Sequence, residues 1–156
     1  MAATIRLATD ADIFLIDEHL YPHLHNNHAP SHTYIRMAIH AFDYFLAVAD
    51  EGMQEDPLLI GAATLHIIMQ SSAGPKGYID DLVVDPSTRR KGIGRLLFQF
   101  LEHIALQHGA TKIFFTCAPW REPGNKFHIA MEYQLRGAAV NEHGTNYYEK
   151  ILAPKT

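Results

Sequence analysis

The order of strand-like and helix-like patterns predicts an α/β fold of the α+β kind, with a mixed central sheet of about six to seven strands and about four helices. Short runs rich in β-branched and aromatic residues alternate with longer segments whose apolar residues recur at helical spacing. At 156 residues, 47% of them hydrophobic, the chain can bury one core, and no linker, repeat or low-complexity tract divides it. We therefore expect a single domain over residues 1–156.

The individual elements are predicted from caps, turns and periodicity. Asp10 is a candidate cap for the first helix, Pro22 its stop, and Gly109 the stop of the most strongly amphipathic helix. The predicted helices cover residues 10–21, 31–42, 93–108 and 125–135. The predicted strands cover residues 4–8, 44–48, 59–69, 78–84, 112–117, 138–140 and 146–152, the last two forming a hairpin.

The most informative stretch is 78–95, where a strand meets a basic, glycine-bearing turn that begins the amphipathic helix. The first N–H groups of a helix have no intrahelical partners, and the helix dipole adds partial positive charge there. Gly92 and Gly94 carry no side chains that would keep a ligand away from the backbone. The turn therefore predicts a site for a phosphate or pyrophosphate.

Spacing separates the phosphate-binding motifs that use such a turn. A Walker A loop requires Gly-x-x-x-x-Gly-Lys-Ser/Thr, which this chain lacks, and a dinucleotide fingerprint requires a third glycine where Leu97 stands. The sequence Arg89-Arg-Lys-Gly92-Ile-Gly94 instead resembles the Gln/Arg-x-x-Gly-x-Gly/Ala signature of the GNAT acetyltransferase superfamily. The predicted element order is similar to that fold over nearly the whole chain.

This resemblance implies a fold in which the fourth and fifth strands splay apart and acetyl-coenzyme A binds as co-substrate. The pantetheine arm would pair with the main chain of the fourth strand, at Leu82, Val83 and Val84. The pyrophosphate would lie against the turn, at Arg89, Arg90, Lys91, Gly92, Ile93, Gly94 and Arg95. Asn125 is a further candidate contact of the coenzyme, although it also suits a helix cap.

Acetyl transfer to an amine requires two proton transfers. An amine with a pKa of about 10.4 must lose a proton at a cost of roughly 4 to 5 kcal/mol at neutral pH, and the leaving thiolate gains one. Tyr133-Gln-Leu-Arg-Gly137 resembles the family's Tyr-x-x-x-Gly, which makes Tyr133 the candidate donor to sulfur. Tyr78-Ile-Asp80-Asp81 resembles an acidic strand of small-amine members, which makes Asp80 the candidate base, through water, with Glu132 in reserve.

Other reactive residues support weaker hypotheses. Six of the 11 histidines precede residue 41, but His23-x-His25-x-x-His28 lies on a loop without cysteine or glutamate, so we expect no metal. The Pro119–Gly124 loop either clamps an acceptor through Trp120 and Arg121 or is an ordinary turn. Cys117 ends an apolar strand and is expected to be a buried apolar residue rather than an acyl-carrying nucleophile.

Charge and composition limit the partners and the compartment. A net charge of −4 disfavours nucleic acid, and no apolar run is long enough to cross a membrane. One cysteine and no signal-peptide pattern favour the cytoplasm. We expect an N-acetyltransferase acting on a small-molecule or peptide amine, with a homodimer suggested by the resemblance alone. The alternatives are another acyl group or acceptor, and a coenzyme A-binding sensor without catalysis.

Overall fold

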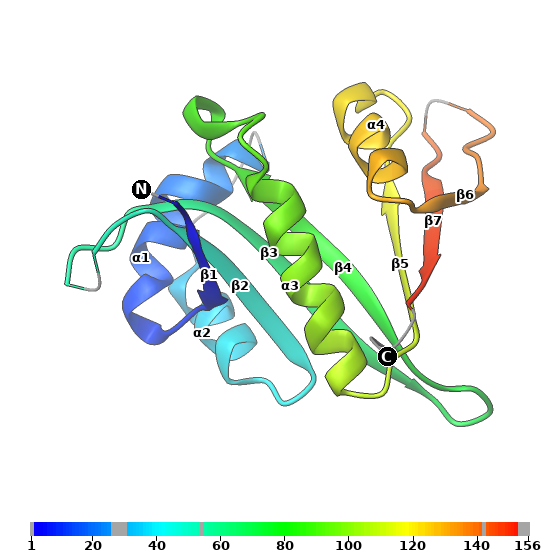
Figure 1. Ribbon diagram of the computed structural model, residues 1–156, viewed down its shortest axis with the longest axis horizontal. Helices are drawn as coiled ribbons and strands as arrows, with labels where there is room; N and C mark the ends of the chain where they lie inside the picture. Colours follow the sequence, from blue (N-terminus) through cyan, green and yellow to red (C-terminus); the bar gives the residue numbers. More distant parts are fainter. Residues whose placement is uncertain (1, 26–30, 54, 142, 153–156) are drawn as a thin grey trace. The chain divides into compact units, whose positions relative to one another are not determined.

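The computed structural model describes residues 2–25, 31–53, 55–141 and 143–152. It contains a mixed sheet with strand order β1-β2-β3-β4-β5-β7-β6, in which β4 and β5 are parallel (Figure 1). The strands are β1 (Thr4–Leu7), β2 (Tyr44–Asp50), β3 (Leu59–Gln70), β4 (Gly74–Val84), β5 (Lys112–Cys117), β6 (Gln134–Gly137) and β7 (Asn146–Ile151). The α-helices are α1 (Ile13–Leu15), α2 (His32–His40), α3 (Ile93–Gln107) and α4 (Glu122–Ala130). The predicted fold class and element order are confirmed.

The chain forms two compact units. The first comprises Met1–His66 and Ile79–Ile104, and the second comprises Ile67–Tyr78 and Ala105–Thr156. Strands β3 and β4 and helix α3 therefore each contribute residues to both units. The single domain over residues 1–156 stays a prediction.

In the first unit, helices pack on both faces of the strands. A Cβ atom at Gly61 would lie 3.1 Å from a methyl group of Ile93 and 3.3 Å from one of Leu97, so Gly61 faces α3. The next residue, Ala62, belongs to a buried cluster with residues of α2 and of the first helical segment, the consecutive helical turns from Asp10 to His23 that include α1. Because successive residues of a strand point to opposite faces, α3 lies on one face and α1 and α2 on the other.

The first helical segment is irregular. Thr9 rather than Asp10 is the N-cap, and a 3₁₀ turn at Asp10–Asp12 precedes α1. A π-helical stretch at Ile16–Leu20 and a second 3₁₀ turn at Tyr21–His23 follow. Pro22 was predicted to stop the first helix, but the helical chain continues past it. Pro22 lies at the start of that last turn, where a missing N–H costs no hydrogen bond. Ser31 caps α2 through Tyr34 N–H.

Helix α3 ends as its sequence predicts. Gly109 has a φ of +79°, its N–H donates to the Leu106 carbonyl at 3.0 Å, and the Ala110 N–H donates to the Ala105 carbonyl at 2.9 Å. This is a Schellman motif, in which a left-handed residue satisfies the last carbonyls of a helix. The glycine turns the chain into β5.

The second unit has an aromatic core. The Phe115 ring of β5 lies 4.3 Å from His128 on α4, 4.7 Å from Tyr133 and 5.6 Å from Tyr148 on β7, between ring centroids. Phe115 and Tyr148 are also opposite each other in the antiparallel β5–β7 ladder. Stacking of these rings fixes α4 against the strands.

Two predictions about this unit are wrong in their boundaries. Helix α4 covers Glu122–Ala130 instead of 125–135, and β6 covers Gln134–Gly137 instead of 138–140. The cause is a second Schellman motif, in which Glu132 has a φ of +67° and the Tyr133 N–H donates to the His128 carbonyl at 3.1 Å. The residue type of Glu132 does not indicate that it adopts a left-handed conformation, so the sequence did not predict the helix end here.

Among the described residues, no helix is both long enough and apolar enough to span a lipid bilayer.

Candidate active site

The predicted anion-binding turn is exposed and has the backbone shape that the prediction requires. Arg90 and Gly92 both have left-handed φ values, +64° and +86°, and alternation of this kind directs successive N–H groups toward one side. Among the described residues, no backbone carbonyl outside α3 accepts from the N–H groups of residues 90–95. Arg89 is anchored, because its Nε donates to the Val84 carbonyl at 3.2 Å. The loop therefore presents free amides and exposed basic side chains to solvent.

Strand β4 is only partly paired with β5. The parallel ladder consists of Gly77 opposite Ile113 and Tyr78 opposite Phe114. Within the described part of the chain, residues 80–84 of β4 have no ladder partner on β5. This is the segment in which Leu82, Val83 and Val84 are predicted to contact pantetheine, and main-chain groups there can pair with an extended ligand.

The first unit contains an open cavity of about 240 Å³ between the helical segment, α2 and β4. Its polar lining includes Asp17, Tyr21, Tyr34 and Asp81, and its apolar lining includes Leu24 and Ile35. The cavity combines two carboxylates and two phenols in one concave surface. Such a surface suits a small polar ligand.

The structure distinguishes the two adjacent acids of β4. Asp80, the predicted base, is exposed, and its Oδ1 accepts a hydrogen bond of 2.9 Å from the Asp81 N–H. Asp81 is half-buried, has a φ of +49° and lines the cavity. Burial and the neighbouring charge of Asp80 raise the pKa of Asp81. The role of Asp80 as base stays a prediction, and Asp81 is the one of the two acids that lines the cavity.

The pKa of Tyr21 is also shifted in this cavity. Burial raises the pKa of its phenol above the usual value, and the negative charges of Asp81 and Asp17 add to the effect. The phenol is therefore neutral at physiological pH and remains a hydrogen-bond donor.

Asp17 was missed by the sequence analysis, although a signal was present. Ile13, Ile16 and Leu20 form the buried face of the first helical segment, and Asp17 stands between them at a spacing that places it on that face. A carboxylate on an apolar helical face needs a polar partner. The structure buries Asp17 completely, in the π-helical stretch, a geometry that often marks functional sites.

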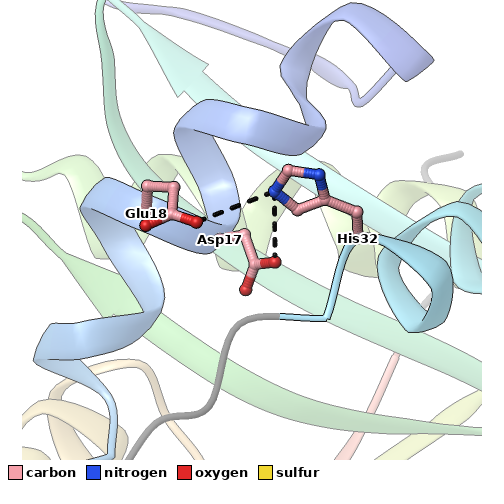
Figure 2. A group of neighbouring side chains, drawn as sticks. All are labelled: Asp17, Glu18 and His32. Carbon is pink, nitrogen blue, oxygen red and sulfur yellow. Dashed lines mark ion pairs between the residues drawn. The ribbon is translucent and has the colours of Figure 1, made fainter.

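His32 contacts this carboxylate from α2. Figure 2 shows its Nε2 between Asp17, at 3.5 Å, and Glu18, at 3.8 Å. Asp17, Glu18 and His32 are side chains that could bind a metal ion, and within the described residues their ligand atoms lie within 4.8 Å of one another. Glu18 and His32 are exposed and pair with each other, an arrangement that needs no metal. Of the histidine triplet weighed from the sequence, His23 and His25 are exposed, and His28 lies outside the described residues.

Tyr133, the predicted proton donor, lies two residues beyond Met131, the C-cap of α4, rather than within the helix. It is 2% exposed, and the Lys150 ammonium lies 5.3 Å from the centre of its ring. The reserve candidate Glu132 is exposed. The catalytic role of Tyr133 stays a prediction.

Asn125 is held by hydrogen bonds within the second unit. Its Nδ2 donates to the carbonyls of Ala118, at 2.9 Å, and Arg121, at 3.0 Å. Its Oδ1 accepts from Asn146 Nδ2 at 2.9 Å and from the Tyr148 hydroxyl at 2.7 Å. These four bonds use the full hydrogen-bonding capacity of an amide side chain. Asn125 thus joins α4 to β7, and its contact with the coenzyme stays a prediction.

The remaining candidates differ in exposure. Cys117 is buried, and burial raises the pKa of its thiol, so a thiolate nucleophile is disfavoured. Burial lowers the pKa of His128 to about 4, which keeps its imidazole neutral. Trp120 is 69% exposed, with the Arg121 guanidinium 5.0 Å from its ring centre, so it does not pack beneath the loop.

A family model decides the classification. The model described as "Acetyltransferase (GNAT) family" matches residues 11–133, which is most of the chain. The chain belongs to the GNAT acetyltransferase family. This membership places it among the acyl-CoA-dependent acyltransferases, as the turn at residues 89–95 predicted. A comparison with curated proteins found no match.

Solved structures of GNAT proteins share its fold. A putative acetyltransferase from Salmonella typhimurium, yncA, solved with acetyl-CoA, is 20% identical, with a TM-score of 0.78 over 100% of this chain and 97% of that one. Arabidopsis thaliana NAA60, solved with a bisubstrate analogue, is 13% identical, with a TM-score of 0.76 over 97% and 98%. Glucosamine-6-phosphate N-acetyltransferase from Arabidopsis thaliana is 17% identical, with a TM-score of 0.74 over 92% and 99%.

Proposed function

We propose that this GNAT protein is an N-acetyltransferase that moves acetyl from acetyl-coenzyme A to a primary amine. The observation that carries the proposal is the turn at residues 90–95, whose left-handed Arg90 and Gly92 leave a row of amides unpaired beside basic side chains. Acetyl-CoA in the yncA and NAA60 structures supports the choice of donor.

The donor would be held by two parts of the first unit. The amides of residues 90–95, with the side chains of Arg90, Lys91 and Arg95, would bind the pyrophosphate, with Arg89 bonded to the Val84 carbonyl in support. The main chain of Leu82, Val83 and Val84 would pair with the pantetheine amides. The bound thioester supplies an activated acyl carbon.

The cavity would hold the acceptor, and an acid of β4 would remove its proton. Transfer of a proton from R–NH₃⁺ to the Asp81 carboxylate leaves a neutral amine, which forms the C–N bond as the C–S bond breaks. The nitrogen then loses a second proton and the thiolate gains one, so the products are the amide, the thiol of coenzyme A and one proton released from Asp81. Tyr133 remains the predicted donor to sulfur, and Asp80, acting through water, the alternative base.

We further propose that the protein is cytoplasmic, acts on an amine of low molecular weight or a peptide amine, and requires no nucleic-acid partner, membrane partner or metal. The homodimer suggested by the family resemblance can be tested by the protein's mass in solution. The acetyl transfer described above requires no metal, nucleic acid or membrane.

Two measurements test the proposal. Calorimetry should detect acetyl-CoA binding to the full chain, and release of coenzyme A should require an added amine. Tyr133→Phe keeps the ring volume and should lower kcat by about 10²-fold, the smaller end of acid–base effects, while acetyl-CoA affinity stays constant. Binding without turnover on any amine would contradict an enzyme and favour a sensor, and faster turnover with longer acyl donors would replace acetyl.

A further inference from the structure

The described lining of the acceptor cavity is acidic rather than basic, although one of its acids, Asp17, also contacts His32 of α2. Asp17 and Asp81 line it, and its described lining contains no lysine or arginine. Tyr21 and Tyr34 add hydrogen-bonding groups and aromatic faces, and His25 is its remaining titratable side chain. A cation gains from both carboxylates and from the faces of the phenol rings, whereas an anion is repelled.

The two carboxylates differ in depth. Asp17 is 0% exposed, whereas Asp81 is half-buried. Asp81 also directly precedes Leu82, where the pantetheine is proposed to pair with β4. An amine that reacts with the thioester would therefore lie beside Asp81, and the remainder of the molecule would extend toward Asp17.

The cavity suits a small molecule. Its volume is about 240 Å³, and it is open to solvent on one side. A chain of a few carbons with a nitrogen at each end fits this space. The apolar side chains of Leu24 and Ile35 provide a surface for its methylene groups.

We propose that the preferred acceptor is a small linear amine with a second positive charge, such as a diamine, whose reacting ammonium contacts Asp81 and whose distal ammonium is attracted, without direct contact, by the charge of the buried Asp17. This inference rests on the proposed N-acetyltransferase activity for its reacting end, and on the cavity alone for its charge preference.

A matched acceptor series tests the preference. 1,4-Diaminobutane, butylamine and 4-aminobutanoate have chains of equal carbon number and end in a cation, a neutral group and an anion. With acetyl-CoA as donor, kcat/KM should be at least about tenfold higher for the diamine than for butylamine, and lowest for 4-aminobutanoate. Equal values, or a preference for the neutral or anionic acceptor, would overturn the inference and leave the N-acetyltransferase proposal intact.

A binding experiment separates this inference from the proposed activity. Calorimetry with 1,4-diaminobutane should show about tenfold weaker binding to Asp81→Asn than to the unmodified chain, and unchanged binding to Asp43→Asn. Asparagine has the shape of aspartate and tolerates a positive φ, so Asp81→Asn should fold, which circular dichroism checks. Asp43 is an exposed carboxylate that pairs with His66 and does not line the cavity, so Asp43→Asn controls for net charge.

The outcomes are distinct. Diamine binding that depends on Asp81 without acetylation of any amine would sustain the cation site and reject the proposed function. Diamine binding no tighter than that of 4-aminobutanoate, or equal in all three proteins, would reject the cation site whatever the turnover.

Discussion

The Tyr148 hydroxyl donates a hydrogen bond of 2.7 Å to Oδ1 of Asn125 across 23 residues of sequence. The same oxygen accepts from Asn146, and the amide nitrogen of Asn125 caps two carbonyls ahead of α4. One side chain therefore connects the start of α4 to the closing strand β7.

Asn125→Ala should be destabilising and should leave coenzyme affinity unchanged. It removes four hydrogen bonds and leaves buried groups without partners, at a cost of about 2 to 3 kcal/mol, or a fall in Tm of about 5 to 10 °C. Thermal unfolding and acetyl-CoA calorimetry well below Tm measure the two effects. As a control, Lys126→Ala at the exposed residue next to Asn125 should change Tm little. Weaker acetyl-CoA binding at an unchanged Tm would instead assign Asn125 to the coenzyme.

Arg90→Gly should stabilise the protein and weaken coenzyme binding. Arg90 has a φ of +64°, which costs a side-chain-bearing residue energy that glycine avoids, so we expect a gain of about 0.5 to 1 kcal/mol. Loss of the guanidinium from the proposed pyrophosphate site should raise the Kd of acetyl-CoA by about five- to tenfold.

Arg90→Ala provides the matched control, because it loses the same charge and keeps the strained backbone. Its Kd should rise as in Arg90→Gly without the increase in Tm. Unchanged affinity in both variants would show that Arg90 does not contact the donor.

Much of this fold was predictable because its signals are local. The α3 stripe, the stop at Gly109 and the strand at Lys112–Cys117 depend on residues close together in the sequence, and each is confirmed. The end of α4 was not predictable, since Glu132 adopts a left-handed conformation that its residue type does not announce. Packing of Tyr133 and His128 against Phe115 fixes that turn through contacts distant in sequence.

The candidate site divides in the same way. The anion-binding turn was predictable from glycine spacing, whereas the choice between Asp80 and Asp81 was not. Strict alternation gives adjacent strand residues opposite faces but does not say which face borders the cavity, and Asp81, which lines it, has a left-handed φ within β4 that its residue type does not indicate. The position of Asp17 on an apolar helical face was visible in the sequence, but its contact with His32 of α2 was not.

His128 should make stability depend on pH between 6.5 and about 4. Burial lowers its folded pKa from 6.5 to about 4, so the unfolded chain binds the proton first as pH falls. The stability present above pH 6.5 is therefore lost progressively through this window, by about 3 kcal/mol at most. Urea unfolding at pH 7, 5.5 and 4.5 should show this slope, and His128→Phe, which keeps a ring beside Phe115, should reduce it. Identical slopes would refute a neutral buried imidazole.

Asp81→Asn and Asp80→Asn should have different effects on catalysis. If Asp81 is the base, Asp81→Asn lowers kcat/KM by about 10² to 10⁴-fold, the usual range for general bases. Burial and the Asp80 charge raise the pKa of Asp81, so the acid limb of the kcat/KM profile should lie above the ordinary value of 3.8. Asp80→Asn removes that charge, lowers the pKa and should move the acid limb to lower pH while turnover continues. The reverse pattern, with turnover lost in Asp80→Asn and retained in Asp81→Asn, would return the role of base to Asp80.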